Sequence, residues 1–391
     1  MTDNFPRSAQ FIDTYFPNID GVVRTVHNYA KAMNKLSYSC VVAPVQNEND
    51  DSSLGYDVFR LPSLPLPIQE YRLSLPSISR TAVEKIAARK LEIFHTHSPF
   101  MIGRYGLRLA RKLRVPIVTT FHSKYYDDVK RLTRSSFIAE EAVKLIVEYY
   151  QKVDSVWTVS RGTASTLRDY GFTGDIYVID NGCEYTFPDN ADTISARATE
   201  KWKLRKDVPV LLFVGHQIWQ KNLKLLLDTL VILKQRYFAF QAVIVGDGYA
   251  ASQIQSYAES VGVKDDVIFT GLITNREELQ GLYLMSDLFF FPSVYDNSPL
   301  VVREAASMAL PSLLVSGSNA ADVITDSVNG FTADETPEAM AKKIEYIFAH
   351  PGLLENAGKN ACELCVSWEE TVLKAGEKYR EIINFYSKKE M

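Results

Sequence analysis

The chain has 391 residues, of which 46% are hydrophobic and 23% charged, and its formal net charge is −4. This composition is typical of a soluble globular protein with a large core and argues against a disordered or collagen-like chain. No run reaches the roughly 18 apolar residues of a membrane span, and the N-terminal sequence does not read as a secretory signal. The four scattered cysteines favour a reducing cytoplasm over a disulfide framework.

The first half of the chain alternates between strand and helix signals. Strands are predicted at 9–13, 39–44, 92–97, 116–122, 155–160 and 175–182, and helices at 21–35, 106–114 and about 125–152. The predicted strands are short, apolar and rich in β-branched residues, as expected for strands covered by helices on both faces.

The second half repeats this alternation after a polar stretch. Strands are predicted at 209–215, 241–248, 267–271, 287–293 and 311–317, with helices at 222–236 and 276–286 between them. Alternation over this length predicts an α/β protein with two doubly wound parallel-sheet domains. We predict an N-terminal domain at 1–188, a linker at 189–207 and a C-terminal domain at 208–370.

Open α/β sheets bind ligands at the carboxyl ends of their strands, so the residues that follow each strand are the first candidates for a site. In the C-terminal half these residues are Gly215, His216 and Lys221, then Gly271 and Leu272, and then the stretch FFFPSVYDNSPLVVREAASM at 289–308.

The last of these stretches predicts an anion site. Asn297-Ser298-Pro299 is expected to cap a helix, with proline at the first helical position. The N–H groups of Leu300 and Val301 then attract an anion, above all a phosphate. Lys221 adds a positive charge at the same edge of the sheet.

Two carboxylates, Asp296 and Glu304, flank this predicted phosphate site. Because they repel a phosphate, they need another role, and a carboxylate readily accepts hydrogen bonds from vicinal hydroxyls. Phosphate together with polyol hydroxyls indicates a nucleotide sugar. The competing interpretation is an aspartate in a turn and a glutamate on a solvated helix face. Motifs of dinucleotide-binding, P-loop and nucleophile-elbow proteins are missing from the sequence.

These motifs resemble glycosyltransferase family 4. The Glu-x7-Glu signature of that family lies on VYDNSPLVVREAA, with Asp296 first and Glu304 second, and its glycine–basic–lysine signature lies on GHQIWQKN at Gly215, His216 and Lys221. The resemblance implies the GT-B fold, in which two Rossmann-like domains face each other across a cleft. It also implies retaining hexosyl transfer from a UDP-sugar, with no cofactor and no obligatory metal ion, and a C-terminal helix, 371–391, that packs on the first domain.

Two residues depart from the pattern of the family. Asp296 is one methylene shorter than the usual glutamate, and His216 replaces the usual arginine. Because a histidine does not carry a permanent positive charge, one cation beside the diphosphate is lost or depends on pH. These departures leave a noncatalytic GT-B partner subunit open as an alternative.

The acceptor side is expected in the first half. The segment PNIDGV, with Asp20 and Gly21, resembles bacterial diacylglycerol glucosyltransferases in particular. This resemblance assigns acceptor binding to Asp20, Gly21, His97 and His122, and places His122 near the reacting sugar. It implies glucose transfer to a membrane glycerolipid such as diacylglycerol. A cell-wall or capsular saccharide acceptor and a sugar-nucleotide epimerase are the alternatives.

Positive charge gathers in one part of the first half. Residues 80–134 hold 13 Lys/Arg against 4 Asp/Glu. We interpret the stretch 104–134 as a surface that contacts anionic lipid, where each cation near the surface adds about 1 kcal/mol. A solvated helix face and an anionic saccharide site are the alternatives, and no nucleic-acid-binding module accompanies the charge. The sequence therefore predicts a cytoplasmic protein that contacts the inner face of the cell membrane.

Overall fold

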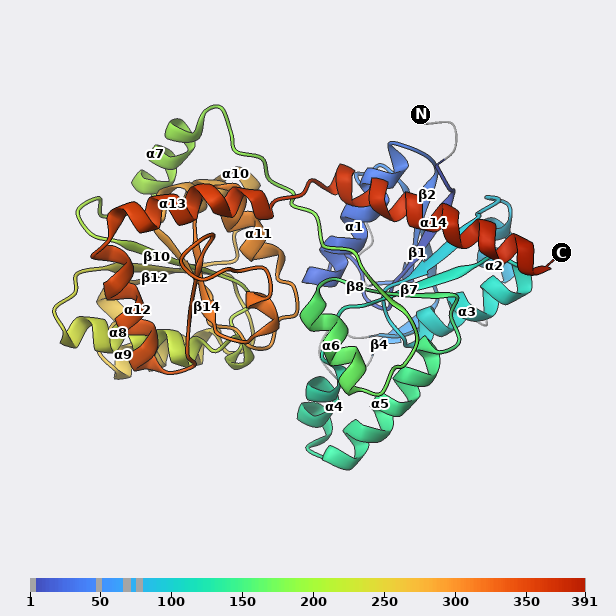
Figure 1. Ribbon diagram of the computed structural model, residues 1–391, viewed down its shortest axis with the longest axis horizontal. Helices are drawn as coiled ribbons and strands as arrows, with labels where there is room; N and C mark the ends of the chain where they lie inside the picture. The colour runs from blue at the N-terminus through green and yellow to red at the C-terminus, as the bar shows by residue number, and fades with distance from the viewer. Residues whose placement is uncertain (1–4, 47–50, 66–71, 75–79, 391) are drawn as a thin grey trace. The chain divides into compact units, whose positions relative to one another are not determined.

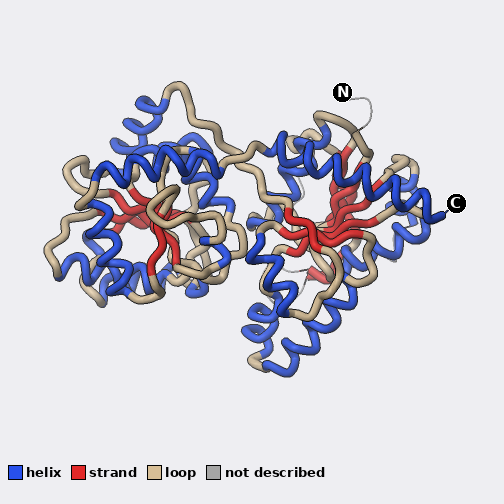
Figure 2. The backbone as a smooth tube through the Cα atoms, in the orientation of Figure 1, coloured by secondary structure: helices blue, strands red, loops and turns tan. Residues whose placement is uncertain are grey.

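The computed structural model of the chain describes residues 5–46, 51–65, 72–74 and 80–390. The chain divides into two compact units, unit 1 (Met1–Gly182 with Ser367–Met391) and unit 2 (Cys183–Val366). Each unit has a central sheet with helices on both of its faces (Figure 2). The predicted pair of doubly wound parallel-sheet domains is thus confirmed.

The sheet of unit 1 has, within the described residues, seven parallel strands in the order β3-β2-β1-β6-β7-β8-β9. They are β1 (Ser8–Phe11), β2 (Ser39–Pro44), β3 (Asp57–Leu61), β6 (Ile93–Thr96), β7 (Ile117–Phe121), β8 (Ser155–Thr158) and β9 (Ile176–Val178). A short antiparallel pair, β4 (Ser63–Pro65) and β5 (Arg72–Ser74), lies apart from this sheet.

The helices of unit 1 connect these strands and cover the sheet (Figure 1). They are α1 (Gly21–Asn34), α2 (Arg80–Ala87), α3 (Met101–Leu113), α4 (Tyr125–Thr133), α5 (Ser136–Tyr150), α6 (Arg161–Asp169) and α14 (Trp368–Glu390). The helical region predicted at about 125–152 is present, but it consists of two helices, because the helix is interrupted between α4 and α5. Arg134 adopts a left-handed backbone conformation, with φ of 55°, and Ser135 accepts a hydrogen bond from Ile138 N as the N-cap of α5.

The C-terminal helix α14 belongs to unit 1 and contributes to its core. Tyr379 is buried, stacks on Trp157 at 5.2 Å between ring centroids, and its hydroxyl lies 2.6 Å from Nδ1 of His95. At the start of the helix, Trp368 packs against Tyr29. The last segment of the chain is thereby tied to the strands that carry the histidines of unit 1.

Unit 2 has six parallel strands in the order β12-β11-β10-β13-β14-β15, all within the described residues. They are β10 (Val210–Val214), β11 (Gln241–Val245), β12 (Val267–Gly271), β13 (Leu288–Phe290), β14 (Ser312–Val315) and β15 (Phe331–Ala333). The α-helices are α7 (Ala191–Trp202), α8 (Leu223–Gln235), α9 (Ala251–Ser260), α10 (Arg276–Met285), α11 (Leu300–Ser307), α12 (Pro337–Phe348) and α13 (Pro351–Ala361).

Helix α7 fills most of the stretch 189–207, for which the sequence predicts a linker. Its two buried residues, Ile194 and Ala198, are apolar and lie four apart, which places them on one face of the helix. That face packs closely on α10, where a Cβ added at Gly281 would lie 2.9 Å from the Cβ of Ala198. A mostly polar sequence thus forms a helix, because its narrow apolar face packs against α10 at Gly281, which has no side chain to keep the two helices apart.

In both sheets the strand order reverses beside the first strand of the unit. In unit 1 the reversal lies between β1 and β6, and in unit 2 between β10 and β13. Loops that follow the two strands at such a point leave in opposite directions, and the carboxyl edge there is the usual ligand site of doubly wound sheets.

One half-buried carboxylate organises this edge in unit 1. Asp13, which follows β1, accepts hydrogen bonds from Ile102 N at 2.8 Å and Gly103 N at 3.4 Å, at the start of α3. The hydroxyl of Ser98 donates to it at 2.6 Å. Burial raises the pKa of the Asp13 carboxyl. Helix α3 has no side-chain cap of its own, so Asp13 supplies the acceptor that its first N–H groups need.

We predict that Asp13→Ala destabilises unit 1 by about 3 kcal/mol, because the substitution leaves these donors buried without an acceptor. Asp13→Asn keeps one carbonyl oxygen and should lose less. Urea unfolding measures the change in stability, and hydrogen exchange of residues 101–113 reports on α3 directly. Wild-type exchange in the alanine variant would contradict the capping role.

Candidate functional site

The two central residues of the predicted donor site lie together in unit 2. The ammonium group of Lys221 forms an ion pair with Oδ1 of Asp296, and the hydroxyl of Ser293 donates to Oδ2 at 2.5 Å. The side chains of Lys221 and Asp296 are 14% and 17% exposed, and the Lys221 ammonium lies 5.5 Å from the Phe291 ring centroid. The pair is therefore largely shielded but still open to a ligand.

Strand order explains this pair, which joins residues 75 positions apart. Lys221 ends a 3-10 turn, η2 (Trp219–Lys221), that follows β10, whereas Asp296 follows β13. Because β10 and β13 are neighbours at the reversal, their loops meet at the carboxyl edge. The sequence-based expectation that residues after strands come together holds for these two.

Glycines position the loop that carries His216. Gly215 N donates to Val245 O at 3.0 Å, and a Cβ added at Gly246 would lie only 2.0 Å from Gly215 O. Gly246 also has φ of 125°, which favours glycine. The Gly-Asp-Gly sequence at 246–248 therefore serves close packing of two loops. His216 itself is exposed.

Helix α11 begins one residue later than the sequence predicts. Pro299 is the N-cap, with φ of −66° and ψ of 125°, and Leu300 is the first helical residue. The predicted cap at Asn297-Ser298 and proline at the first helical position are wrong by one residue. Asn297 is buried and accepts a hydrogen bond from Asn319 Nδ2 at 2.7 Å, so its amide holds the loop rather than the helix. Leu300 and Val301 occupy the first turn, where N–H groups have no partner within a helix.

Glu304 is buried, so its interpretation as a solvated helix residue is wrong. Its Oε2 accepts from the hydroxyl of Tyr283 at 2.9 Å, and its Oε1 accepts from the Arg276 guanidinium at 3.1 Å. Burial, followed by the Glu304 charge, raises the pKa of Tyr283 well above its usual value of 10, so the hydroxyl keeps its proton and donates. Glu304 thus has a fixed orientation on α11, in the same loop–helix segment as Asp296.

Sequence reasoning missed Arg276, which organises this part of the site. Its guanidinium also lies 3.0 Å from Glu184 and stacks over the Tyr185 ring at 4.2 Å. The signal was present, because Arg276 opens the helix that follows β12 and so lies at the same carboxyl edge. Gly271 and Leu272 occupy that edge as well, with Leu272 64% exposed.

In unit 1 the predicted acceptor residues His97 and His122 lie side by side. His97 Nδ1 is 3.0 Å from His122 Nε2, and His97 Nε2 is 3.0 Å from Oε1 of Gln10. In the third histidine, His95, the ring nitrogen Nε2 lies 2.6 Å from Thr120 Oγ1, and Nδ1 lies 2.6 Å from the hydroxyl of Tyr379. These contacts link strands β1, β6 and β7 with α14.

Burial sets the charge of these imidazoles. It lowers the pKa of His122 to about 3, and burial together with the neighbouring histidines lowers the pKa of His97 and His95 well below 6.5. All three are therefore neutral at pH 7, when each ring offers one donor and one acceptor. Because so low a pKa makes a weak proton acceptor, His122 suits hydrogen bonding to a ligand better than general-base catalysis.

The other two predicted acceptor residues lie at the start of α1. Asp20 is its N-cap, and its Oδ1 accepts from Val23 N at 2.8 Å. A Cβ added at Gly21 would meet nothing within 4 Å. The space beside this glycine is thus open, and its role in ligand approach stays a prediction.

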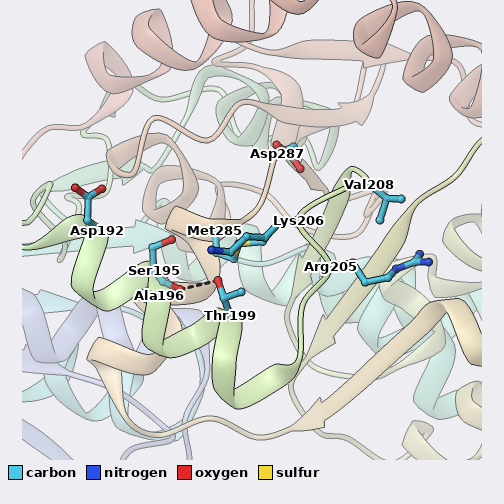
Figure 3. A pocket seen from close by; sticks show the side chains of 9 residues that line it. All are labelled: Asp192, Ser195, Ala196, Thr199, Arg205, Lys206, Val208, Met285 and Asp287. Atoms are coloured by element: carbon cyan, nitrogen blue, oxygen red, sulfur yellow. Dashed lines mark hydrogen bonds between the residues drawn. The ribbon is translucent and has the colours of Figure 1, made fainter.

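A pocket of about 320 Å³ lies elsewhere in unit 2 (Figure 3). It is lined by Asp192, Ser195, Ala196, Thr199, Arg205, Lys206, Val208, Met285 and Asp287. Val208 and Asp287 lead into β10 and β13, so the pocket adjoins the amino edge of the sheet, opposite Lys221 and Asp296. It is not the predicted donor site.

Comparison with known proteins identifies the class. Residues 19–186 match Glycosyltransferase Family 4, and residues 195–364 match Glycosyl transferases group 1. The crystal structure of Anabaena Alr3699/HepE in complex with UDP and glucose has the same fold, with a TM-score of 0.74, 15% identity, and coverage of 95% of this chain and 98% of that one. The chain belongs to the family 4 glycosyltransferases with the GT-B fold.

Two relatives are similar over most of their length. Alpha-monoglucosyldiacylglycerol synthase of Streptococcus pneumoniae is 23% identical over 355 residues, which cover 90% of this chain and 80% of the relative. The protein of the same name from Acholeplasma laidlawii is 26% identical over 375 residues, 91% of each chain. Among the described residues, no helix is long and apolar enough to cross a bilayer.

We predict that unit 1 loses stability as the pH falls below about 6.5, the pKa of an unperturbed histidine. Below that pH the unfolded chain takes up protons that folded His122, with its pKa of about 3, does not. Protonation therefore favours unfolding throughout this interval. The effect should be fully absent above about pH 7.5 and grow towards pH 4.

Thermal unfolding from pH 8 to 4 tests this prediction, with His122→Gln as the comparison. The variant should show a shallower fall, because a glutamine does not titrate. Carboxylates such as Asp13, whose raised pKa acts in the opposite direction, are common to both proteins. Equal pH profiles in the two would show that His122 is not the group responsible.

Proposed function

We propose that this glycosyltransferase moves a hexose, namely glucose, from a UDP-sugar to the hydroxyl of a membrane glycerolipid such as diacylglycerol, with retention of configuration. Unit 2 binds the donor and unit 1 binds the acceptor. The observation that carries the donor side is the ion pair of Lys221 with Asp296 at the strand reversal of unit 2, with Glu304 on the helix that follows Asp296.

Lys221 holds the diphosphate in this proposal. Its ammonium is 14% exposed and already neutralised by Asp296, so a diphosphate oxygen can replace or share that partner without leaving a bare charge. The N–H groups at the start of α11 add a favourable dipole for the same anion. As the bond to the sugar breaks, negative charge grows on the diphosphate, and these fixed donors stabilise it.

Asp296 and Glu304 orient the sugars of the donor. Asp296, once its lysine turns to the diphosphate, accepts hydrogen bonds from hexose hydroxyls. Glu304 keeps Arg276 and Tyr283 as partners and uses its remaining lone pairs for the ribose hydroxyls. A diphosphate oxygen takes the proton of the acceptor on the leaving-group face, so no carboxylate nucleophile is needed. The charge balance is met by side chains and helix N–H groups, and we propose that no metal ion is required.

The glycerolipid acceptor is supported by the two relatives whose names state glucosyldiacylglycerol synthesis and by the surface of unit 1. Helices α4 and α5 form a projecting hairpin (Figure 1). At its corner Leu132, Phe137 and Ile138 are 53%, 71% and 47% exposed. Exposed Lys130, Arg131 and Arg134 lie beside them in the sequence.

This corner favours the second half of the basic stretch 104–134 as the part that would face lipid in the proposal. In α3 the apolar residues Ile102, Tyr105 and Leu109 are buried in unit 1, so the exposed side chains of this helix after residue 104 are the cations Arg108, Arg111 and Lys112. At the corner, apolar and cationic side chains are exposed together. Apolar insertion and attraction to anionic lipid then reinforce each other.

The decisive assay gives the purified chain UDP-glucose and diacylglycerol vesicles, with GDP-mannose, a monoglycosyl lipid and a capsular saccharide as alternatives. We expect UDP release together with a monoglucosyl lipid, an α-anomeric product by NMR, and unchanged turnover with EDTA. No UDP release with any pair would favour the noncatalytic subunit. Conversion of the donor without an acceptor would favour an epimerase.

We predict that Lys221→Ala lowers kcat on the order of 10²–10³-fold, the usual loss when a donor to a developing oxyanion is removed. Lys224→Ala removes the same charge three residues away, from a side chain that is 61% exposed and paired with Asp228, and should retain wild-type turnover. Thermal unfolding of both variants checks the fold. Wild-type turnover in Lys221→Ala would remove its assigned role.

We predict that Phe137→Ser weakens binding to vesicles with anionic lipid at least several-fold, because it removes apolar area that would leave water on docking. Phe385→Ser is the matched control, since Phe385 on α14 is 72% exposed against 71% for Phe137. Co-sedimentation at low and high salt separates the apolar from the cationic contribution. Equal binding by both variants would move the contact away from this corner.

A further inference from the structure

Two cysteines lie where the chain passes between the two units. Cys183 is the first residue of unit 2, and Cys365 is the last residue but one. Cys183 N donates to Val366 O at 2.7 Å, which joins the entering and leaving segments. Both thiols are reduced in the structure.

The two sulfur atoms approach the same atom. Sγ of Cys183 lies 3.5 Å and Sγ of Cys365 lies 3.1 Å from the carbonyl oxygen of Arg303 in α11. The Arg303 side chain is buried and donates to Leu364 O at 2.8 Å, which holds the turn η5 (Cys362–Leu364) against α11. The buried Arg303 side chain thus holds the turn that precedes Cys365, and both sulfur atoms lie within 3.5 Å of the same carbonyl oxygen.

The pair also has the electrostatics of a reactive dithiol. The neighbouring Cys365 thiol is the largest cause that lowers the pKa of Cys183, to about 7. The same contact raises the pKa of Cys365, so the proton stays there. Burial instead raises the pKa of Cys40, in β2, to about 12. A thiolate beside a thiol is the arrangement that oxidises most readily.

We propose that Cys183 and Cys365 form a redox modification site, which closes as a disulfide when the protein meets hydrogen peroxide. Cys183 is buried whereas Cys365 is half-buried, so a small oxidant suits the site. Formation of this disulfide requires neither a sugar donor nor a sugar acceptor, so the inference does not rest on the proposed function.

The reaction balances in two steps. The Cys183 thiolate attacks one peroxide oxygen, the O–O bond breaks, and the departing hydroxide takes a proton to give water and a sulfenic acid. Cys365 then attacks the Cys183 sulfur, an S–S bond forms, and the S–O bond breaks. The second oxygen leaves with the Cys365 proton as water. Two thiols lose two electrons, and one peroxide becomes two waters.

The disulfide closes a ring through nearly all of unit 2, because Cys183 and Cys365 stand at its two ends. Such a link restricts the unfolded chain and is expected to stabilise the closed segment. It also makes the hydrogen-bonded junction between the entering and leaving segments covalent.

The test treats the full chain with a small excess of hydrogen peroxide, blocks remaining thiols by alkylation, and maps the peptides by mass spectrometry. We expect a Cys183–Cys365 cross-link that dithiothreitol reverses, and a higher thermal unfolding midpoint of the oxidised protein. Cys183→Ser and Cys365→Ser should each abolish both effects. Cys362→Ser, which changes the exposed thiol of the same C-x-x-C sequence, and Cys40→Ser should retain them.

Other outcomes would overturn the proposal. A Cys362–Cys365 cross-link would assign the chemistry to the C-x-x-C pair alone. Oxidation that proceeds at Cys183 to a sulfinic acid without a cross-link would show that Cys365 does not reach it. A Cys183–Cys365 cross-link that leaves the thermal unfolding midpoint unchanged would show that the disulfide does not stabilise unit 2.

Discussion

The ion pair of Lys221 with Asp296 is the interaction on which the proposed donor site of unit 2 depends. Neither residue has a local partner of opposite charge at helical spacing, and the pair exists because β10 and β13 are neighbours where the strand order reverses. Because both side chains are largely buried, either charge alone would lose hydration free energy without compensation, whereas the attraction between the two charges offsets that loss. A ligand that carries both a diphosphate and hydroxyl groups can bind Lys221 and Asp296 at once. Water molecules can also bind both side chains, but they are held less rigidly.

Glu304 stands in contrast to that adaptable pair. Arg276 and Tyr283 occupy both of its oxygens from a different helix, and Arg276 is itself held by Glu184 and the Tyr185 ring. A planar guanidinium between two carboxylates and an aromatic face has little freedom to turn. The site therefore combines one carboxylate that can exchange partners with another whose orientation is fixed, in keeping with distinct roles towards the two sugars of a nucleotide sugar.

The predicted acceptor site of unit 1 contains buried, uncharged histidines rather than an ion pair. Its three histidines form a neutral row between β1, β6, β7 and α14, and their rings lie at hydrogen-bonding distance from hydroxyls, an amide and one another. The capping of α3 by Asp13 fixes the neighbouring edge of the same sheet. An uncharged group of hydrogen-bonding side chains suits an alcohol acceptor better than an anionic one.

The sequence alone determined the alternation of elements, the parallel sheets and the positions of Lys221, Asp296 and Glu304 after strands or at a helix start, because these follow from local patterns of apolar residues and from motifs. It did not reveal the helix at 191–202, the one-residue shift at Pro299, or the partners Arg276, Tyr283, Asp13 and Tyr379. Those depend on contacts between residues that are distant in the chain. His95 and Tyr379, for example, are 284 positions apart, and only the tertiary structure decides which buried polar group meets which, since a buried donor must find its acceptor wherever the packed elements place one.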